Sequence, residues 1–416
     1  MMKLCKYSIE DIIIIYEDGT TDTIPQDNII YMYIEKDYFK NFLPIFNIKC
    51  MITDDLYIKL NKNNPKYKVQ VNKFYLNNDG TAFDKNNSTI VQQKFINDIF
   101  ININKVDLSP SMMKNLYDRN DINMKDDRTE LEKANKEFDL YLFKEDSISY
   151  RKLNNKIFQN TDLISTIIAL SQLTDQNKLL ISYLDNTDIY DNIIIPQNLT
   201  FIGIIKYLQS IYGLYNTSYF LFDDFDTLYL LNKDTKCTAL KKGELQRVYI
   251  NYEDILDPKG NRYGFERQVP YKAYRIYCID SPQITNINNQ SNELLYDDLV
   301  YMDTNNGNET KVEITGEKNI GIRNTKIVDN KYGNEFVINS FIYENKLNQT
   351  TIMSSFNELD IDILTPNKEY YIDIKLDNYD YSKIKGLVKL SRMMTVFQKT
   401  DDSIFIANTK CEFKRP

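Results

Sequence analysis

The sequence contains no histidine among its 416 residues. Histidine is the side chain that most often serves as a general base, a proton shuttle or a metal ligand near neutral pH. Its absence excludes Ser-His-Asp and Cys-His catalysis and zinc sites of the Cys/His kind. Acid chemistry between two carboxylates is the enzymatic alternative that composition leaves open.

Cysteine is scarce and does not form a metal-binding or redox motif. The five cysteines are far apart, odd in number and without a C-x-x-C pair: Cys5, Cys50, Cys237, Cys278 and Cys411. A four-cysteine zinc site needs paired spacings. We therefore expect reduced, mostly buried cysteines that act as small hydrophobic side chains in a protein made in a cytosol.

Long hydrophobic runs and concentrated basic segments are also missing. No stretch reaches the roughly 18 apolar residues that span a bilayer as a helix, and Glu10 and Asp11 interrupt the short apolar run near the start. This run is too short and too acidic for a signal peptide. Acidic residues outnumber basic ones by 59 to 51, with both signs interspersed along the chain. A nucleic-acid reader needs a concentrated basic face, so we do not expect one here.

No complete ligand-binding motif occurs. Gly316 and Gly321 have the separation of a phosphate-binding loop, but Ile322 follows where lysine is required. The segment 223–226 (Asp-Asp-Phe-Asp) lacks the alternating acids and the distal glutamate of a calcium loop. Adjacent acids mostly stand in apparent turns, where Asp is common. We predict no catalytic residue, no cofactor and no metal site, and therefore no enzymatic activity.

The residues that are abundant favour strands. The sequence has 32 tyrosines and 21 phenylalanines, and aromatic side chains fit the pleated, half-buried surface of a sheet. A chain of this length usually forms two or three domains. The pattern predicts a β-rich α+β fold in which two β-barrel-like domains flank a small α/β domain.

Residues 1–104 are predicted to form the first barrel-like domain. Short strand-like runs alternate with turn signals, among them Asp18-Gly19 and Asp79-Gly80. The expected strands are Ile9–Tyr16, Ile29–Tyr33, Phe42–Ile48, Leu56–Leu60, Tyr67–Leu76 and Phe95–Ile103.

Residues 105–151 are predicted to be a charged, solvated connector. Its expected helix covers 126–137, where Glu132 and Lys136 stand four apart in the favourable order for a surface pair. The alternative is an arm that reaches a neighbouring subunit.

Residues 152–245 are predicted to form the small α/β module. A first helix follows Thr161 as N-cap, and a second follows Asn198 or Thr200 and ends at Gly213. Strands are expected at Leu179–Leu184, Ile193–Pro196, Tyr219–Phe222 and Thr227–Leu231.

Residues 246–416 are predicted to form the second barrel-like domain. Its turns are rich in Asn and Gly. The expected strands are Val248–Tyr252, Tyr271–Ile279, Thr310–Ile314, Glu335–Tyr343, Leu359–Leu364, Tyr370–Leu376, Gly386–Phe397 and Ile404–Phe413.

Several segments of the middle module resemble the central module of baseplate hub proteins from contractile-tailed bacteriophages or related phage-tail-like particles. They are Ile195–Thr200, Ile204–Leu208, Tyr212–Tyr215 and Phe222–Leu231, and Leu364–Tyr371, Gly386–Leu390 and Phe413–Arg415 near the C-terminus resemble the same family. The residues that carry the resemblance in the module are Pro196, Asn198, Leu199, Tyr212, Gly213, Tyr215, Phe222, Asp223, Asp226 and Tyr229.

The resemblance implies a structural virion protein of the tail baseplate, made in the cytoplasm of a host bacterium. It implies a homotrimer whose two similar barrels per subunit form a pseudo-sixfold ring, with the tail tube protein above, the spike protein below and other baseplate proteins around it. DNA would pass through the lumen without specific binding, and no membrane insertion is expected. The alternatives are a tail-tube initiator or distal-tail adaptor and, in a different class, a tail-associated cell-wall hydrolase or carbohydrate-binding protein.

Overall fold

The computed structural model of the chain describes most of its residues. The described residues are 3–62, 64–77, 93–102, 136–172, 174, 178–233, 247–253, 264–268, 273–280, 282–288, 298–303, 309–313, 323–328, 335–344, 348–375, 385–400 and 404–415. The predicted turn at Asp79-Gly80, Cys237 and the connector up to residue 135 lie outside them.

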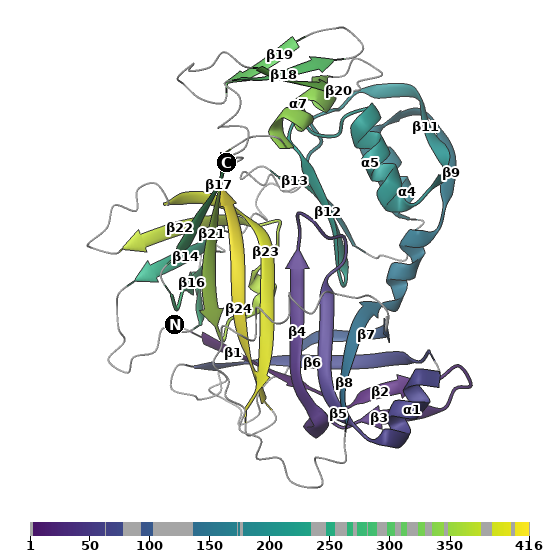
Figure 1. Ribbon diagram of the computed structural model, residues 1–416, viewed down its shortest axis with the longest axis vertical. Coiled ribbons are helices and arrows are strands. Elements are labelled where there is room, and N and C mark those ends of the chain that lie inside the picture. The colour runs from purple at the N-terminus through teal and green to yellow at the C-terminus, as the bar shows by residue number, and fades with distance from the viewer. Residues whose placement is uncertain are drawn as a thin grey trace.

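The N-terminal strands form a closed antiparallel ring together with the last two strands of the chain (Figure 1). Its members, in pairing order, are β1 (Lys3–Ile9), β6 (Lys66–Asn77), β7 (Gln93–Asn102), β8 (Lys136–Lys144), β5 (Ile45–Ile52), β4 (Ile29–Asp37), β23 (Gly386–Lys399) and β24 (Ile404–Arg415). Since β24 pairs with β1, the ring closes. The hairpin β2 (Ile12–Ile15) and β3 (Thr21–Ile24) extends from β6, and Gly19 occupies its turn with φ 81°, as Asp18-Gly19 predicted.

A second ring of pairings is built on the same three strands, β1, β23 and β24. Its other members are β15 (Phe265–Gln268), β16 (Ala273–Tyr277), β14 (Arg247–Glu253) and β22 (Glu369–Lys375). Strand β14 runs parallel to both of its neighbours. Two further strands, β21 (Asn348–Asn357) and β17 (Gln283–Asn288), extend from β24.

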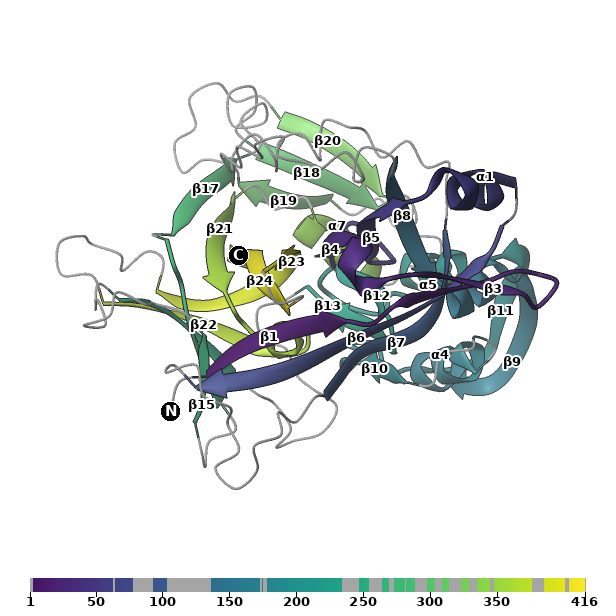
Figure 2. The same ribbon diagram turned by 90° about the horizontal axis from the view of Figure 1, so that it is seen from below.

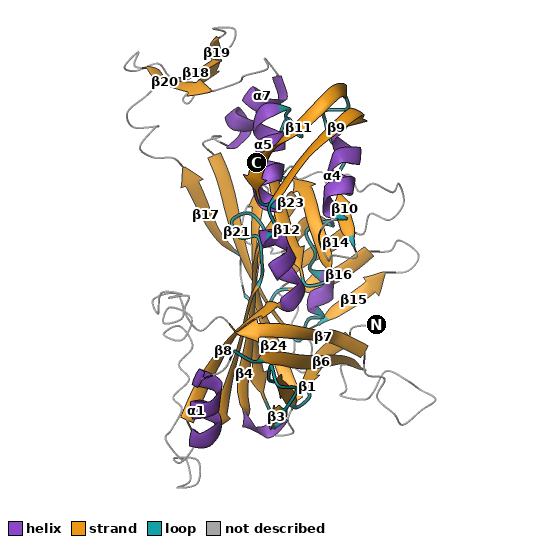
Figure 3. Cartoon of the chain, turned by 90° about the vertical axis from the view of Figure 1, so that its right-hand side faces the viewer, coloured by secondary structure: helices purple, strands orange, loops and turns teal. Residues whose placement is uncertain are grey.

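The long hairpin β23–β24 runs through both rings (Figure 3). Residues 386–388 of β23 pair with β22 in the second ring, and residues 392–398 pair with β4 in the first. Buried side chains of both rings form one continuous hydrophobic cluster. The barrels are therefore fused through shared strands, and the C-terminal hairpin completes the N-terminal ring.

The α/β module lies beside the rings and has a hydrophobic core of its own (Figure 2). The ribbon β9 (Asn154–Asp162) and β11 (Ile189–Leu199) curls around α4 (Leu163–Ser171) and α5 (Phe201–Ile211). A small sheet contains β10 (Leu179–Ile181), β13 (Thr227–Asn232) and β12 (Tyr219–Asp224). The remaining elements are η1 (Gln26–Asn28), α1 (Asp54–Lys62), η2 (Glu145–Arg151), β18 (Asp298–Asp303), β19 (Glu309–Glu313), β20 (Arg323–Val328), α7 (Glu335–Glu344) and η3 (Ile361–Ile363).

The β-rich fold class is confirmed, and so are the two predicted helices of the module. The Thr200 hydroxyl caps α5 by accepting the Gly203 N–H, and Gly213 follows the helix with φ 68°. The cap of α4 is Asp162, one residue after the predicted Thr161, because the Asp162 carboxylate accepts the Ser165 N–H. The four described cysteines are free and buried, as expected.

Three predicted strands are wrong. Leu56–Leu60 lies within α1, because the Thr53 carbonyl accepts the Tyr57 N–H and starts a helical turn. Glu335–Tyr343 is α7, where Val337 and Ser340 lie three apart and are both buried. Leu359–Leu364 contains the turn η3, since the Leu359 carbonyl and the Ile361 N–H bond to one side chain of β1, that of Tyr7, in place of a ladder.

The predicted connector is shorter than expected, because residues 136–151 form β8 and η2. Only Lys136 and Glu137 of the predicted helix are described, and both belong to β8. Phe138, Leu140 and Leu142 are buried at every second position, which is the period of a strand. The charged residues Lys136, Glu137 and Asp139 at the start of this stretch hid the alternation.

Candidate functional site

The segment between β21 and β22 lies where the two rings meet. It contains η3, and the buried Tyr7 of β1 holds it at two points. The Tyr7 hydroxyl donates to the Leu359 carbonyl at 3.1 Å and accepts the Ile361 N–H at 3.0 Å. The segment is thereby fixed to a strand that both rings share.

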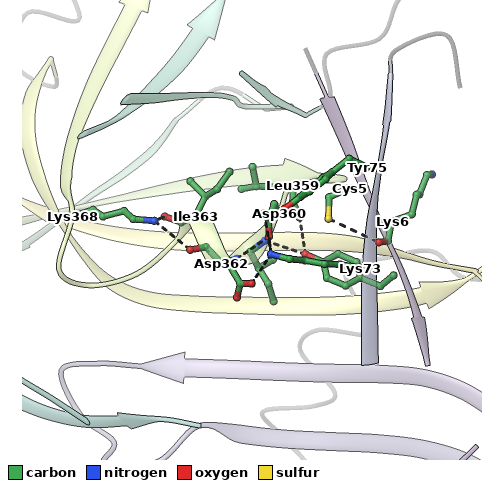
Figure 4. A network of polar contacts seen from close by, with 11 residues as sticks. Cys5, Lys6, Lys73, Tyr75, Leu359, Asp360, Asp362, Ile363 and Lys368 are labelled. Atoms are coloured by element: carbon green, nitrogen blue, oxygen red, sulfur yellow. Dashed lines mark hydrogen bonds and ion pairs between the residues drawn. The ribbon is translucent and has the colours of Figure 1, made fainter. Parts of the chain in front are cut away.

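A buried ionic network joins β6 to this segment (Figure 4). The Lys73 Nζ lies 2.9 and 3.1 Å from the two carboxylate oxygens of Asp360 and 2.5 Å from Asp362 Oδ2. The Tyr75 hydroxyl donates to Asp360 at 2.6 Å. Burial by itself would lower the pKa of Lys73, but the two carboxylates hold it above its ordinary value. Lys73 therefore stays charged and fully bonded in a place with little water.

Lys368 fixes the other end of the same segment. Its Nζ donates to the carbonyl oxygens of Asp362 at 3.2 Å and of Ile363 at 2.7 Å (Figure 4). Burial lowers the pKa of Lys368 to about 8, although Asp360 and Asp362 oppose this shift. One lysine thus holds the carboxylates and the other holds the backbone of η3.

Arg392 stands where β23 passes from one ring to the other. A register shift between Leu390 and Arg392 marks the point at which β23 leaves β22 and begins to pair with β4. The guanidinium contacts Glu35 of β4 at 2.6 Å and Glu412 of β24 at 3.1 Å. This ion network joins three strands at the crossing.

The β12–β13 hairpin docks onto the open end of the first ring. Phe225 occupies the turn with φ 50°, and its ring lies 6.0 Å from Phe46 and 6.1 Å from Phe100. The Lys36 Nζ lies 2.6 Å from Asp224, and both side chains are buried. Burial raises the pKa of Asp224, and Lys36 acts against this shift. The Phe225 carbonyl accepts a hydrogen bond from Lys144 at 2.6 Å.

The predicted family-resemblance residues lie in three parts of the structure: the end of β11, the end of α5 with the segment after it, and the β12–β13 hairpin. Pro196, Asn198 and Leu199 lie at the end of β11, and Tyr212 and Gly213 end α5. Tyr215 is buried, and its hydroxyl interacts with Ser182.

The rest of the predicted set lies on the docking hairpin. Asp223 donates its N–H to the Phe42 carbonyl at 2.8 Å, and Phe222 packs edge-on against Tyr38 with ring centroids 4.7 Å apart. Asp226 pairs with Lys178, and Tyr229 lies opposite Phe222 in the ladder. The structure therefore brings Phe222, Asp223, Asp226 and Tyr229 together, apart from the β11 residues.

The sequence prediction missed the ionic residues at these junctions. Lys73 and Asp360 are 287 positions apart, and no local motif connects them. One signal was present, because Lys73 continues the alternation of the buried Val69 and Val71. A lysine on the inward face of a strand indicates a buried partner.

Two features are absent from the described residues. None of their helices is long and apolar enough to cross a membrane. Among the same residues, no group of three or more Cys, Asp or Glu is placed to hold a metal ion.

Comparison with known proteins identifies several solved structures with a similar fold, among them the following two. The tail protein from Neisseria meningitidis MC58 superposes with a TM-score of 0.51 at 10% identity, covering 98% of this chain and 96% of that one. A chain of the lidded Francisella PdpA-VgrG complex gives a TM-score of 0.52 at 10% identity, covering 99% of this chain and 53% of that one. At such identities the likeness shows a shared fold.

Sequence comparison gives one family. No curated protein matches the chain. A family model described as bacteriophage PBS1 gene 109 protein matches residues 2–411, and the chain therefore belongs to that bacteriophage protein family.

Proposed function

We propose that the chain is a structural protein of a phage tail, a baseplate hub subunit that joins the tail tube to the central spike and has no enzymatic activity. Family membership supports a phage protein. The fold shared with a Neisseria tail protein and with part of a VgrG complex supports a place in a tail or a related particle.

The observation that carries the proposal is the fusion of two barrel-like rings through β1, β23 and β24. The Lys73–Asp360 ion pair then ties β6 of the first ring to the segment that leads into β22 of the second, and Arg392 ties β23 to β4 through Glu35. A subunit that stands between two different assemblies needs barrels that keep a fixed relation, and this construction provides it.

The proposed assembly is a homotrimer whose six barrels surround a lumen, with the tail tube protein on one side, the spike protein on the other and further baseplate proteins outside. The net charge of -8 suits a surface past which DNA moves without binding. The protein would be made in the host bacterial cytoplasm and end in the virion.

The two alternative functions predict experimental results that differ from those expected of a hub. A tail-tube initiator or distal-tail adaptor would form rings that bind the tube protein but not the spike. A cell-wall hydrolase or carbohydrate-binding tail protein would act on peptidoglycan or bind glycans as a monomer.

The test begins with the purified full chain. Light scattering is expected to give the mass of three chains or of a multiple of three, and electron micrographs are expected to show threefold rings. Co-purification with the tube and spike proteins of the same phage then separates a hub from a tube initiator. A stable monomer that cleaves peptidoglycan or binds glycans would refute the hub assignment.

A further inference from the structure

Exposed apolar side chains concentrate on the α/β module and on η2, which precedes it. The described part of the chain exposes ten large hydrophobic side chains, and seven of them lie between residues 148 and 194: Ile148, Leu153, Ile157, Ile168, Tyr183, Ile189 and Ile194. Single exposed hydrophobic residues are ordinary, but a concentration of them indicates an interaction surface.

The β9–β11 ribbon contributes a facing pair of these exposed side chains. Ile157 and Ile194 are directly opposite each other in the ladder and are 64% and 52% exposed. On the other face of the ribbon, Ile193 is buried and Phe158 packs against the core of the module. Figures 1 and 2 both show the ribbon at the outer edge of the molecule. A partner could therefore reach the Ile157–Ile194 pair.

A basic and an acidic residue stand at equal distances along the sequence from the two members of this pair. Arg151 precedes Ile157 by six positions (157 − 151), and Asp188 precedes Ile194 by six (194 − 188). Because the two strands are antiparallel, Arg151 and Asp188 lie toward opposite ends of the ribbon. Both are exposed, and neither forms an ion pair within the described part of the chain. Arg151, at the end of η2 just before β9, and Asp188, just before β11, thus give the two ends of the ribbon opposite charges.

We propose that the outer face of the β9–β11 ribbon binds the same face of a second copy of this chain. A two-fold axis through the centre places Ile157 and Ile194 against their counterparts. It also brings Arg151 of each copy to Asp188 of the other. Such a self-complementary patch is what an isologous contact requires.

The contact uses the face of the ribbon and not its edge. Pro196 in β11 has no N–H to donate to an added strand. Asn160 and Asn198 have positive φ values of 46° and 65°, which make both strands irregular. Irregular edges of this kind oppose edge-to-edge pairing.

The contact is independent of the proposed hub ring and goes beyond it. A two-fold contact requires an even number of chains, so threefold rings would pair into assemblies of six, and a chain that forms no ring would be a dimer. The patch is small, and we expect weak association that depends on concentration.

Sedimentation equilibrium of the full chain over a range of concentrations tests the proposal. The mass is expected to rise to an even number of chains, and Ile194→Asp is expected to halve it. Ile284→Asp is the matched control, since Ile284 on β17 is 43% exposed and far along the chain from the ribbon. This control should leave the mass unchanged.

Charge reversal separates the contact from a folding defect. Arg151→Glu is expected to weaken association at least tenfold, and the double variant Arg151→Glu with Asp188→Arg is expected to restore it. A mass that stays at one or three chains at all concentrations, or that does not respond to Ile194→Asp, overturns the proposal. Loss of threefold rings with the even-numbered contact retained would refute only the hub assignment.

Discussion

The Lys73 ammonium lies 2.9 Å from a carboxylate oxygen of Asp360, although the two residues are 287 positions apart in the sequence. Each side chain is only 7% exposed. Residues near both ends of the chain must therefore be in place before either charge is satisfied. Removal of one partner from such a pair leaves the other charge buried, which is more costly than the pair is stabilising.

Lys73→Met is expected to lower the free energy of unfolding by about 3 to 5 kcal/mol. Asp360 would keep Tyr75 as a hydrogen-bond donor but lose its counter-ion. Urea denaturation followed by circular dichroism measures the change.

The matched control is Lys59→Met. Lys59 pairs with Asp22 at 2.6 Å, but the two side chains are 45% and 33% exposed. Exposed pairs contribute at most about 1 kcal/mol, so this variant should be nearly as stable as the wild type. Equal losses from the two substitutions would contradict the role given to burial of Lys73.

The β12–β13 turn offers a comparison of two ion pairs within one hairpin. Asp224 and Lys36 are buried, whereas Asp226 and Lys178 are each 65% exposed. In double-mutant cycles with alanine, we expect a coupling energy above about 1.5 kcal/mol for the first pair and near zero for the second. Thermal unfolding of the single and double variants gives both values. A weak coupling between Lys36 and Asp224 would show that aromatic packing alone docks the hairpin.

Local signals in the sequence were enough to predict much of the module but not the fusion of the rings. Thr200 and Gly213 bound α5 through short-range bonds and backbone conformation, which a sequence pattern contains. By contrast, the alternation of apolar and polar residues in β23 and β24 shows which face of each strand is buried, but not which strands lie beside them. These strands pair with β4 and β1, more than 350 positions away in the chain. The junction residues depend on such pairings, and this is why Lys73 and Asp360 were missed.

The lowered pKa of Lys368 leads us to expect that the folded chain becomes more stable as pH rises. Its pKa is lowered by burial to about 8 in the folded chain, against an ordinary value of 10.5. Between these values the unfolded chain binds a proton that the folded chain has released, so unfolding becomes less favourable as pH rises. Below pH 8 Lys368 is protonated in both the folded and the unfolded chain, and the folded chain bears the full free-energy cost of burying its charge.

The wild type is therefore expected to gain about 2 kcal/mol relative to Lys368→Met between pH 7 and pH 9.5. Denaturant titrations of both proteins at several pH values measure this difference. The buried tyrosines are common to both proteins, so their titration cancels in the comparison. Parallel pH profiles would show that Lys368 is not desolvated as the structure indicates.

Closure of the second ring depends on a close backbone approach at Gly264. Strand β1 meets β15 at the single pair Lys3 and Phe265. Gly264 has φ 96°, and a Cβ atom built on it would lie 2.1 Å from the Lys3 carbonyl oxygen. Because that oxygen belongs to the backbone of a strand in both rings, it cannot move without disturbing the ladder between β1 and β6.

Gly264→Ala is expected to destabilise the chain by more than about 3 kcal/mol, since both the positive φ and the clash oppose it. Gly19→Ala separates these two causes, because Gly19 has φ 81° but no atom within 4 Å of a built Cβ. It should cost about 1 kcal/mol from backbone conformation alone. Guanidinium denaturation of both variants gives the difference. If Gly264→Ala costs no more than Gly19→Ala, β1 does not approach β15 this closely and the second ring is open at that point.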